Sequence, residues 1–168
     1  ECVFGSTGFT GVLFHGAHES SEAWLHALEG RKAESGFADL HLLDFPGFGD
    51  SWTCGGREWT VPEWAALIRA AIDRVAESAD AGSLILVAHG LSTLPLSMAL
   101  LGGRRWTPKI GFVALLNPVS WLKRPGRSEV SRVVADSWPG PLEVREWIRG
   151  LAELRTPVLI VQTEPRMR

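Results

Sequence analysis

The sequence predicts an α/β protein in which helices cover both faces of a mostly parallel sheet. The first supporting observation is the apolar run at residues 84–88, which is too short for a helix and lacks the alternation of a half-exposed strand. Such a run fits a central strand buried on both faces. The second is the apolar face of a helix that follows directly, at residues 94–101. The third is the repetition of strand and helix through five cycles, which favours right-handed crossovers between parallel strands.

Each predicted strand is a short apolar run that ends in a loop. The strands are expected at residues 10–14, 38–43, 84–88, 110–116 and 157–162, with a further short edge strand at residues 2–4. The predicted helices carry apolar side chains at three- and four-residue spacing. Ser20 or Ser21 is suited to cap the first of them, which breaks at Gly30. The later helices are expected at residues 61–78, 94–101, 129–137 and 141–154.

The composition is that of one globular domain. The chain has 168 residues, of which 45% are hydrophobic and 21% charged. We expect a single domain over residues 1–168, with residues 119–155 as a small helical cap or lid. A net charge of −2 without a basic stripe argues against a nucleic-acid partner. Cys2 and Cys54 belong to no metal-binding pattern, so we expect neither a metal nor another cofactor.

The sequence also lacks the signals of membrane insertion and of secretion. No apolar run approaches the ~20 residues that span a bilayer, and no charged-then-apolar segment opens the chain. We therefore expect no membrane partner and a cytoplasmic location. The oligomeric state is left open.

The corner after the central strand is the stretch on which the functional interpretation depends. A strand that turns sharply into a helix is the setting of the nucleophile elbow, G-x-S-x-G, which lifts a serine hydroxyl above the sheet. In this chain the same five places read Ala-His-Gly-Leu-Ser, at residues 88–92. Gly90 stands where the nucleophile is expected and has no side chain to attack a substrate.

Taken together, six segments resemble the α/β-hydrolase superfamily over residues 11–162. They are VLFHG at 12–16, the helix that contains Trp24, DFPGFGDS at 44–51, LILVAHGLS at 84–92, VALLNP at 113–118 and TPVLIV at 156–161. The resemblance implies an α/β-hydrolase-like fold, although the family's C-terminal strand and helix have no counterpart in this sequence. It also implies an oxyanion hole built from the backbone N–H groups of Ala17 and Leu91.

The catalytic triad of the family is incomplete in this sequence. Gly90 replaces the nucleophile, and the stretch that matches the family's acid contains Glu164 and Arg166. All five histidines lie before residue 90, so none matches the triad base in chain order. If the protein is an enzyme, the base is supplied by His18, Glu19, Glu164 or the substrate itself, and His18 and Glu164 are the candidate catalytic residues.

Several further residues have expected roles at or near the site. Glu19, Ser92 and Trp121 are candidate substrate-binding residues, together with Ala17 and Leu91. Ser92 is more suited to cap the following helix than to act as a displaced nucleophile, because Pro95 then falls in the first turn. The remaining polar residues near the strand ends are expected to be structural: His15 orders its loop, Asp44 organises its turn, and His89 points into the sheet.

The leading hypothesis is an α/β-hydrolase-fold protein with a degenerate catalytic centre. It would bind a small acyl, ester-like or peptide ligand, and would catalyse epimerisation, isomerisation or elimination next to a carbonyl. One alternative is a serine esterase or thioesterase in which Gly90 replaces the nucleophile and the C-terminal histidine segment is absent. The other is a binding module without catalytic activity.

Overall fold

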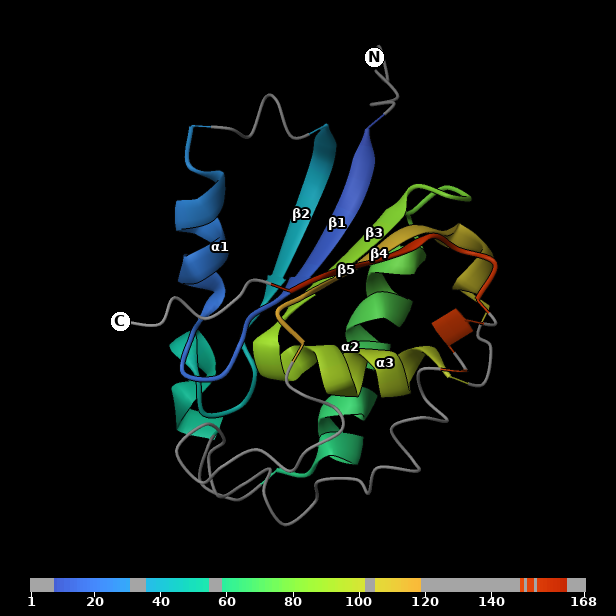
Figure 1. Ribbon diagram of the computed structural model, residues 1–168. Helices are drawn as coiled ribbons and strands as arrows, with labels where there is room; N and C mark the ends of the chain where they lie inside the picture. Colours follow the sequence, from blue (N-terminus) through green and yellow to red (C-terminus); the bar gives the residue numbers. More distant parts are fainter. Residues whose placement is uncertain are drawn as a thin grey trace.

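The computed structural model describes residues 8–30, 36–54, 59–101, 105–118, 149, 151–152 and 154–162. Within them, five parallel strands form one sheet in the order β2-β1-β3-β4-β5 (Figure 1). The strands are β1 (Phe9–Phe14), β2 (Phe37–Leu43), β3 (Leu84–His89), β4 (Ile110–Leu116) and β5 (Val158–Val161). The predicted α/β class and the five strands are confirmed, and no strand end moves by more than one residue.

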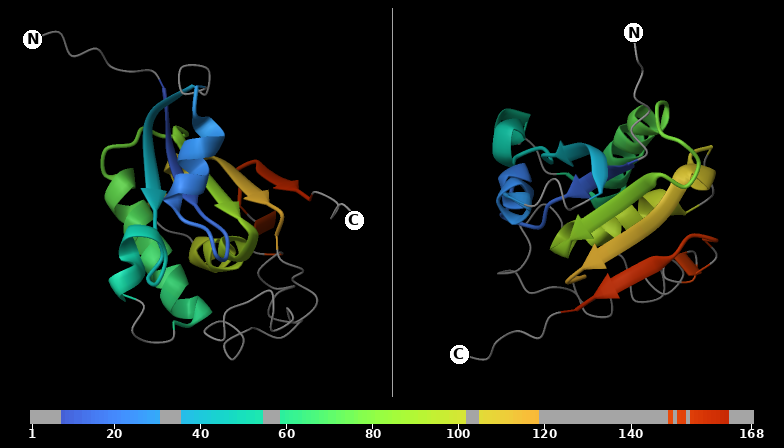
Figure 2. Two further views of the ribbon diagram at one scale, coloured as in Figure 1. Left: turned by 90° about the vertical axis from the view of Figure 1, so that its left-hand side faces the viewer. Right: turned by 90° about the horizontal axis from the view of Figure 1, so that it is seen from above.

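Helices cover both faces of this sheet. The helix α1 (Ser21–Leu28) lies on one face, while α2 (Val61–Ala76) and α3 (Thr93–Leu100) pack together on the other (Figure 2). In the part of the chain that the structure describes, three short 3-10 helices connect the elements: η1 (Gly49–Cys54), η2 (Gly90–Ser92) and η3 (Thr107–Lys109). The chain thus has the predicted layers, and α2 ends two residues earlier than the expected range of 61–78.

Local sequence explains where α2 begins. The Thr60 hydroxyl accepts a hydrogen bond from the Glu63 N–H, and the Glu63 carboxylate accepts one from the Thr60 N–H at 2.8 Å. This reciprocal capping box satisfies two backbone donors that the first turn leaves without partners, and a cap of this kind contributes about 1 kcal/mol. Pro62 fits the first turn, where no helical N–H is needed.

The core lies between the sheet and the α2 and α3 layer. The Phe45 ring stacks on the Trp64 ring, with centroids 4.8 Å apart and an interplanar angle of 15°. The most deeply buried side chains include Phe14, Ile68, Ile72, Leu84, Leu86, Leu94, Leu96, Leu100, Trp106 and Leu115. By contrast, α1 has no buried residue. The helix α1 therefore packs less tightly against its face of the sheet than α2 and α3 do against theirs, and a pocket lies beside it.

The strand register brings three loops together at the carboxyl ends of the strands. Phe14 pairs with Ala88 on one side and with Leu43 on the other. The carboxyl ends of β1, β2 and β3 therefore align. Ligands in open α/β sheets bind at the carboxyl ends of the strands. The loops that begin at His15, Asp44 and Gly90 all start there.

Some predicted elements lie outside the described residues. These are the edge strand at residues 2–4, the helix at 129–137, most of the helix at 141–154, and most of the cap at 119–155. No helix in the described part of the chain is long and apolar enough to span a bilayer.

Candidate functional site

The corner between β3 and α3 has the backbone conformation of a nucleophile elbow. Gly90 has a φ of +55°, in the left-handed region that strains residues with a side chain, and it opens the short helix η2. A Cβ atom built at this position would lie 3.6 Å from the Gly16 Cα, an ordinary van der Waals distance. The predicted corner is confirmed, and a side chain at position 90 would have space beside Gly16.

The Ser92 hydroxyl holds this corner in place. Its Oγ accepts a hydrogen bond from the His89 N–H at 3.1 Å. It also donates toward the His89 carbonyl oxygen at 2.9 Å and the Phe14 carbonyl oxygen at 3.0 Å. The helix starts where the sequence predicts, but the predicted cap is wrong in detail, because the Ser92 side chain makes no capping bond to α3. The Ser92 side chain is fully buried, and it does not line the pocket beside α1 that is described below.

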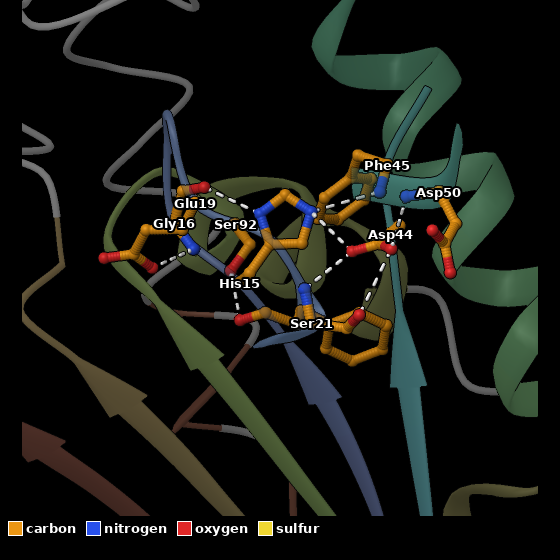
Figure 3. Close-up of polar contacts among 9 residues, drawn as sticks. His15, Gly16, Glu19, Ser21, Asp44, Phe45, Asp50 and Ser92 are labelled. Carbon is orange, nitrogen blue, oxygen red and sulfur yellow. Dashed lines mark hydrogen bonds and ion pairs between the residues drawn. The ribbon is translucent and has the colours of Figure 1, made fainter. Parts of the chain in front are cut away.

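His15 is a structural residue in the first loop, as predicted. Its Nδ1 lies 2.7 Å from the Gly16 carbonyl oxygen and its Nε2 lies 3.1 Å from the Phe45 nitrogen (Figure 3). Since the Phe45 N–H is a donor, Nε2 must accept and Nδ1 must carry the proton. Burial lowers the pKa of His15, which keeps the ring neutral with both nitrogens engaged by the backbone.

Asp44 organises the turn after β2, also as predicted. Its carboxylate accepts hydrogen bonds from the Ser21 N–H at 2.6 Å, the Ser21 hydroxyl at 3.1 Å and the Asp50 N–H at 3.0 Å (Figure 3). Burial alone raises the pKa of Asp44, but these hydrogen bonds outweigh it and hold the pKa below its ordinary value. The charged carboxylate thus joins the start of α1 to the loop after β2.

Glu19 and His89 form a pair beside the corner. The Glu19 Oε2 accepts the Gly16 N–H at 2.8 Å and lies 2.9 Å from the His89 Nδ1. Burial raises the pKa of Glu19, but the hydrogen bonds from His89 and Gly16 outweigh it, so the pKa lies below its ordinary value. The prediction that His89 points into the sheet is wrong, because the carboxylate draws its ring toward the first loop.

A pocket of about 340 Å³ opens next to this pair, at the carboxyl ends of β3, β4 and β5. Its other wall is α1, and the His89 ring meets the Trp24 ring nearly at a right angle, with centroids 6.4 Å apart. Beyond Glu19 and His89, the lining residues are Ala23, Trp24, Ala27, Leu116, Asn117 and Val161. The lining is mostly apolar with a few polar groups, which is typical of small-molecule sites.

The predicted site residues are only partly brought together. Ala17 lies half-buried in the loop that faces the corner, and Leu91 follows Gly90 directly with its side chain buried. His18 is exposed in the turn after β1 with a φ of 61°, and it does not line the pocket. Trp121 and Glu164 lie outside the described residues.

A second pocket lies away from the corner. It has a volume of about 620 Å³ and is formed by β2, the loop after it and α2, with Val12, His41, Leu67 and Arg74 among its lining residues. It is larger, but neither Glu19 nor His89 lines it. In the described ranges, no three His, Cys, Asp or Glu side chains are grouped so that they could hold a metal ion.

Sequence reasoning missed His89, Trp24 and Asn117 as site residues. Asn117 directly follows β4 with a φ of 46°, in the left-handed region that asparagine enters more readily than most other residues. The position of His89, directly before the expected nucleophile position, could have indicated from the sequence that it is a site residue. Its carboxylate partner, however, is 70 residues away in the sequence, and only the strand register reveals the pair.

The comparisons with known proteins agree with the fold of this chain. The sequence model of the alpha/beta hydrolase family matches residues 12–166. No curated protein matches the chain significantly. Among solved structures, a pyrethroid hydrolase is similar with a TM-score of 0.54 at 13% identity, over 94% of this chain and 89% of that one. At that level of identity, the likeness concerns the fold alone.

Two further structures are similar over a smaller part of their own length. Tomato methylketone synthase I, complexed with 2-tridecanone, has a TM-score of 0.49 at 17% identity, over 74% of this chain and 43% of that one. An extracellular alpha/beta-hydrolase from a Paenibacillus species has a TM-score of 0.49 at 13% identity, over 66% and 40%. The chain thus spans less than half the length of these two structures. Because the family model covers most of the sequence, the chain belongs to the alpha/beta hydrolase family.

Proposed function

We propose that this chain binds a small carbonyl-containing ligand, an acyl, ester-like or peptide compound, at a degenerate hydrolase centre. The observation that carries the proposal is Gly90, which has the elbow conformation, faces Gly16 and has no nucleophilic side chain. In the proposed complex, the ligand occupies the pocket beside α1, and its carbonyl oxygen accepts hydrogen bonds from the backbone N–H groups of Ala17 and Leu91.

Such a site favours proton transfer next to the carbonyl over acyl transfer. Two amide donors stabilise the negative charge that develops on the oxygen when the neighbouring carbon loses a proton. Epimerisation, isomerisation and elimination all begin with that step. The sequence nominates His18, Glu19 and Glu164 as possible bases, and of the two that lie in the described residues, His18 and Glu19, only Glu19 lines the pocket.

Ligand binding is tested with two compounds of the same shape, acetophenone and ethylbenzene, which differ in the carbonyl oxygen. We expect acetophenone to raise the melting temperature more than ethylbenzene does. Ligand at 100 times its Kd stabilises a folded protein by about 2.7 kcal/mol. Equal shifts by the two compounds would contradict the proposed carbonyl contact.

A pocket-filling variant locates the binding site. Ala27 is exposed on α1 and lines the pocket, so A27F should fill the pocket without disturbing the core. Ala66 is an exposed alanine on α2 outside the pocket, and A66F is the matched control. We expect A27F to abolish the acetophenone shift and A66F to preserve it. An unchanged shift in A27F would place the ligand elsewhere.

The esterase alternative is supported by the space at position 90, where a side chain would meet Gly16 at an ordinary contact distance. The variant G90S restores the nucleophile and is assayed with p-nitrophenyl acetate. Rapid hydrolysis by G90S, absent from the unmodified chain, would favour an inactivated serine hydrolase over a centre adapted to other chemistry. We expect no such gain, because the structure brings no histidine to the triad base position in the described part of the chain.

A further inference from the structure

The pair formed by Glu19 and His89 has the arrangement of a base held by a carboxylate. An ionised carboxylate only accepts hydrogen bonds, so the contact of 2.9 Å requires a proton on the His89 Nδ1. The neutral ring then carries its lone pair on Nε2, which is the atom that can remove a proton. Glu19 is itself fixed by the Gly16 N–H at 2.8 Å, so the orientation of the ring is set by the first loop.

The five histidines differ in what their rings can do. His15 has both nitrogens engaged by backbone groups. His18 and His41 are exposed away from the pocket lining, and His26 is an exposed residue of α1 whose side chain is 79% accessible. His89 is 30% accessible and lines the pocket, and in the described part of the chain only Nδ1 has a hydrogen-bond partner. It is therefore both oriented and reachable by a ligand.

The residues around Glu19 and His89 favour the contact between these two side chains. A Cβ atom at Gly16 would lie 2.8 Å from the Glu19 Oε2 and 2.9 Å from the His89 Nδ1, so only glycine leaves the contact undisturbed. The Trp24 ring stands against the histidine ring from the side of α1. Gly90 directly follows His89, which places the base next to the corner where the proposed ligand carbonyl is held.

We infer that His89, oriented by Glu19, is the general base of this site and removes a proton from the carbon next to the bound carbonyl. The C–H bond breaks, its electron pair forms the C=C bond of an enolate, and the carbonyl electrons move to the oxygen. The proton bonds to Nε2, and the resulting imidazolium is paired with the Glu19 carboxylate. Return of a proton from the ring to the same carbon completes the cycle. The inference rests on the proposed function, because it requires a carbonyl ligand in this pocket.

The inference is tested by exchange of the methyl protons of acetophenone in D2O, followed by NMR. The variant H89N keeps an N–H donor near the Nδ1 position for Glu19 but has no base at Nε2. General acid–base groups contribute about 10²–10⁴-fold, so we expect H89N to lose exchange by at least about 100-fold. H26N, a histidine variant outside the pocket, should exchange like the unmodified protein. Melting temperature and circular dichroism check that both variants are folded.

A second variant separates positioning from binding. In E19Q the amide oxygen can still accept from the Gly16 N–H and from Nδ1, but the negative charge that stabilises the imidazolium formed on His89 is lost. We expect E19Q to lower exchange by about 10-fold or more, while the thermal shift with acetophenone stays unchanged. If E19Q lost binding and exchange in equal measure, Glu19 would be a ligand contact and would not position a base.

The outcomes distinguish the inference from the function on which it rests. Unchanged exchange in H89N, or loss of exchange in H18N with H89N active, would overturn the assignment of His89. Acetophenone binding without exchange above the buffer rate in the unmodified protein would also overturn it, and would leave the binding proposal standing. Absence of any acetophenone-specific thermal shift would contradict the proposed function and the inference together.

Discussion

The Ser92 hydroxyl lies 3.0 Å from the Phe14 carbonyl oxygen and so joins the corner after β3 to the end of the neighbouring strand β1. The Ser92 Oγ also accepts a hydrogen bond from the His89 N–H at 3.1 Å. One small side chain thus fixes the two loops that the proposed site requires side by side, and it does so from a fully buried position. The residue that resembles a displaced nucleophile is a structural link.

Replacing Ser92 by alanine should therefore destabilise the fold. S92A leaves the His89 N–H and the Phe14 carbonyl oxygen without this partner, at a cost of about 1–3 kcal/mol in the free energy of unfolding. Urea denaturation measures the loss, and S78A, at an exposed serine after α2, is the control. A change below about 0.5 kcal/mol in S92A would show that the hydroxyl does not hold the corner.

The second prediction concerns the pH dependence that His15 gives to stability. Because burial lowers the pKa of His15 from 6.5, the unfolded chain takes up a proton at a higher pH than the folded chain does. Stability should then decrease as the pH falls below about 6.5. H15Q lowers stability at every pH but should flatten this slope between about pH 5 and 7, as measured by urea denaturation. An equally steep slope in H15Q would assign the dependence to other groups.

The third prediction concerns Asp44, whose pKa is lowered. A group with a lowered pKa stabilises the fold above its unfolded value of 3.8, and this contribution disappears as the pH falls through the folded value. D44N weakens the hydrogen bonds from Ser21 and Asp50 and should cost about 1–3 kcal/mol at pH 7. The difference from the unmodified protein should shrink below about pH 4. D39N, at an exposed aspartate on β2, should show neither effect.

The fourth prediction tests whether position 90 has room for a side chain. Gly90 and Gly82 both have positive φ, at +55° and +73°, and a Cβ at Gly82 would have no neighbour within 4 Å. G90A and G82A should therefore cost similar amounts, about 1–2 kcal/mol each, from backbone strain alone. A much larger loss of stability in G90A would show that the space beside Gly16 is closed to a nucleophile.

The sequence could predict the fold because its strands are marked locally. The runs at residues 84–88 and 110–116 are apolar and bounded by loop residues, and they become β3 and β4 with at most one residue of change. The corner at Gly90 could also be predicted, since a buried strand that meets a helix without a linker must turn sharply. The roles of His15 and Asp44 follow from the same local logic.

The pairing of Glu19 with His89 could not be predicted from the sequence. It depends on the register of Phe14 with Ala88, which places the first loop against the corner. It also depends on Gly16, whose missing side chain leaves room for the contact. The capping bond expected of Ser92 failed for a related reason: a neighbouring strand supplied a carbonyl oxygen that local sequence does not show.

The central claim is that a ligand carbonyl is held and polarised at a corner without a nucleophile. Infrared spectroscopy of acetophenone labelled with ¹³C at the carbonyl carbon tests it most directly, because amide hydrogen bonds to the oxygen weaken the C=O bond. We expect the bound carbonyl band to lie at a lower frequency than in water, and we expect A27F to abolish this band. A bound band at or above its frequency in water would contradict the claim.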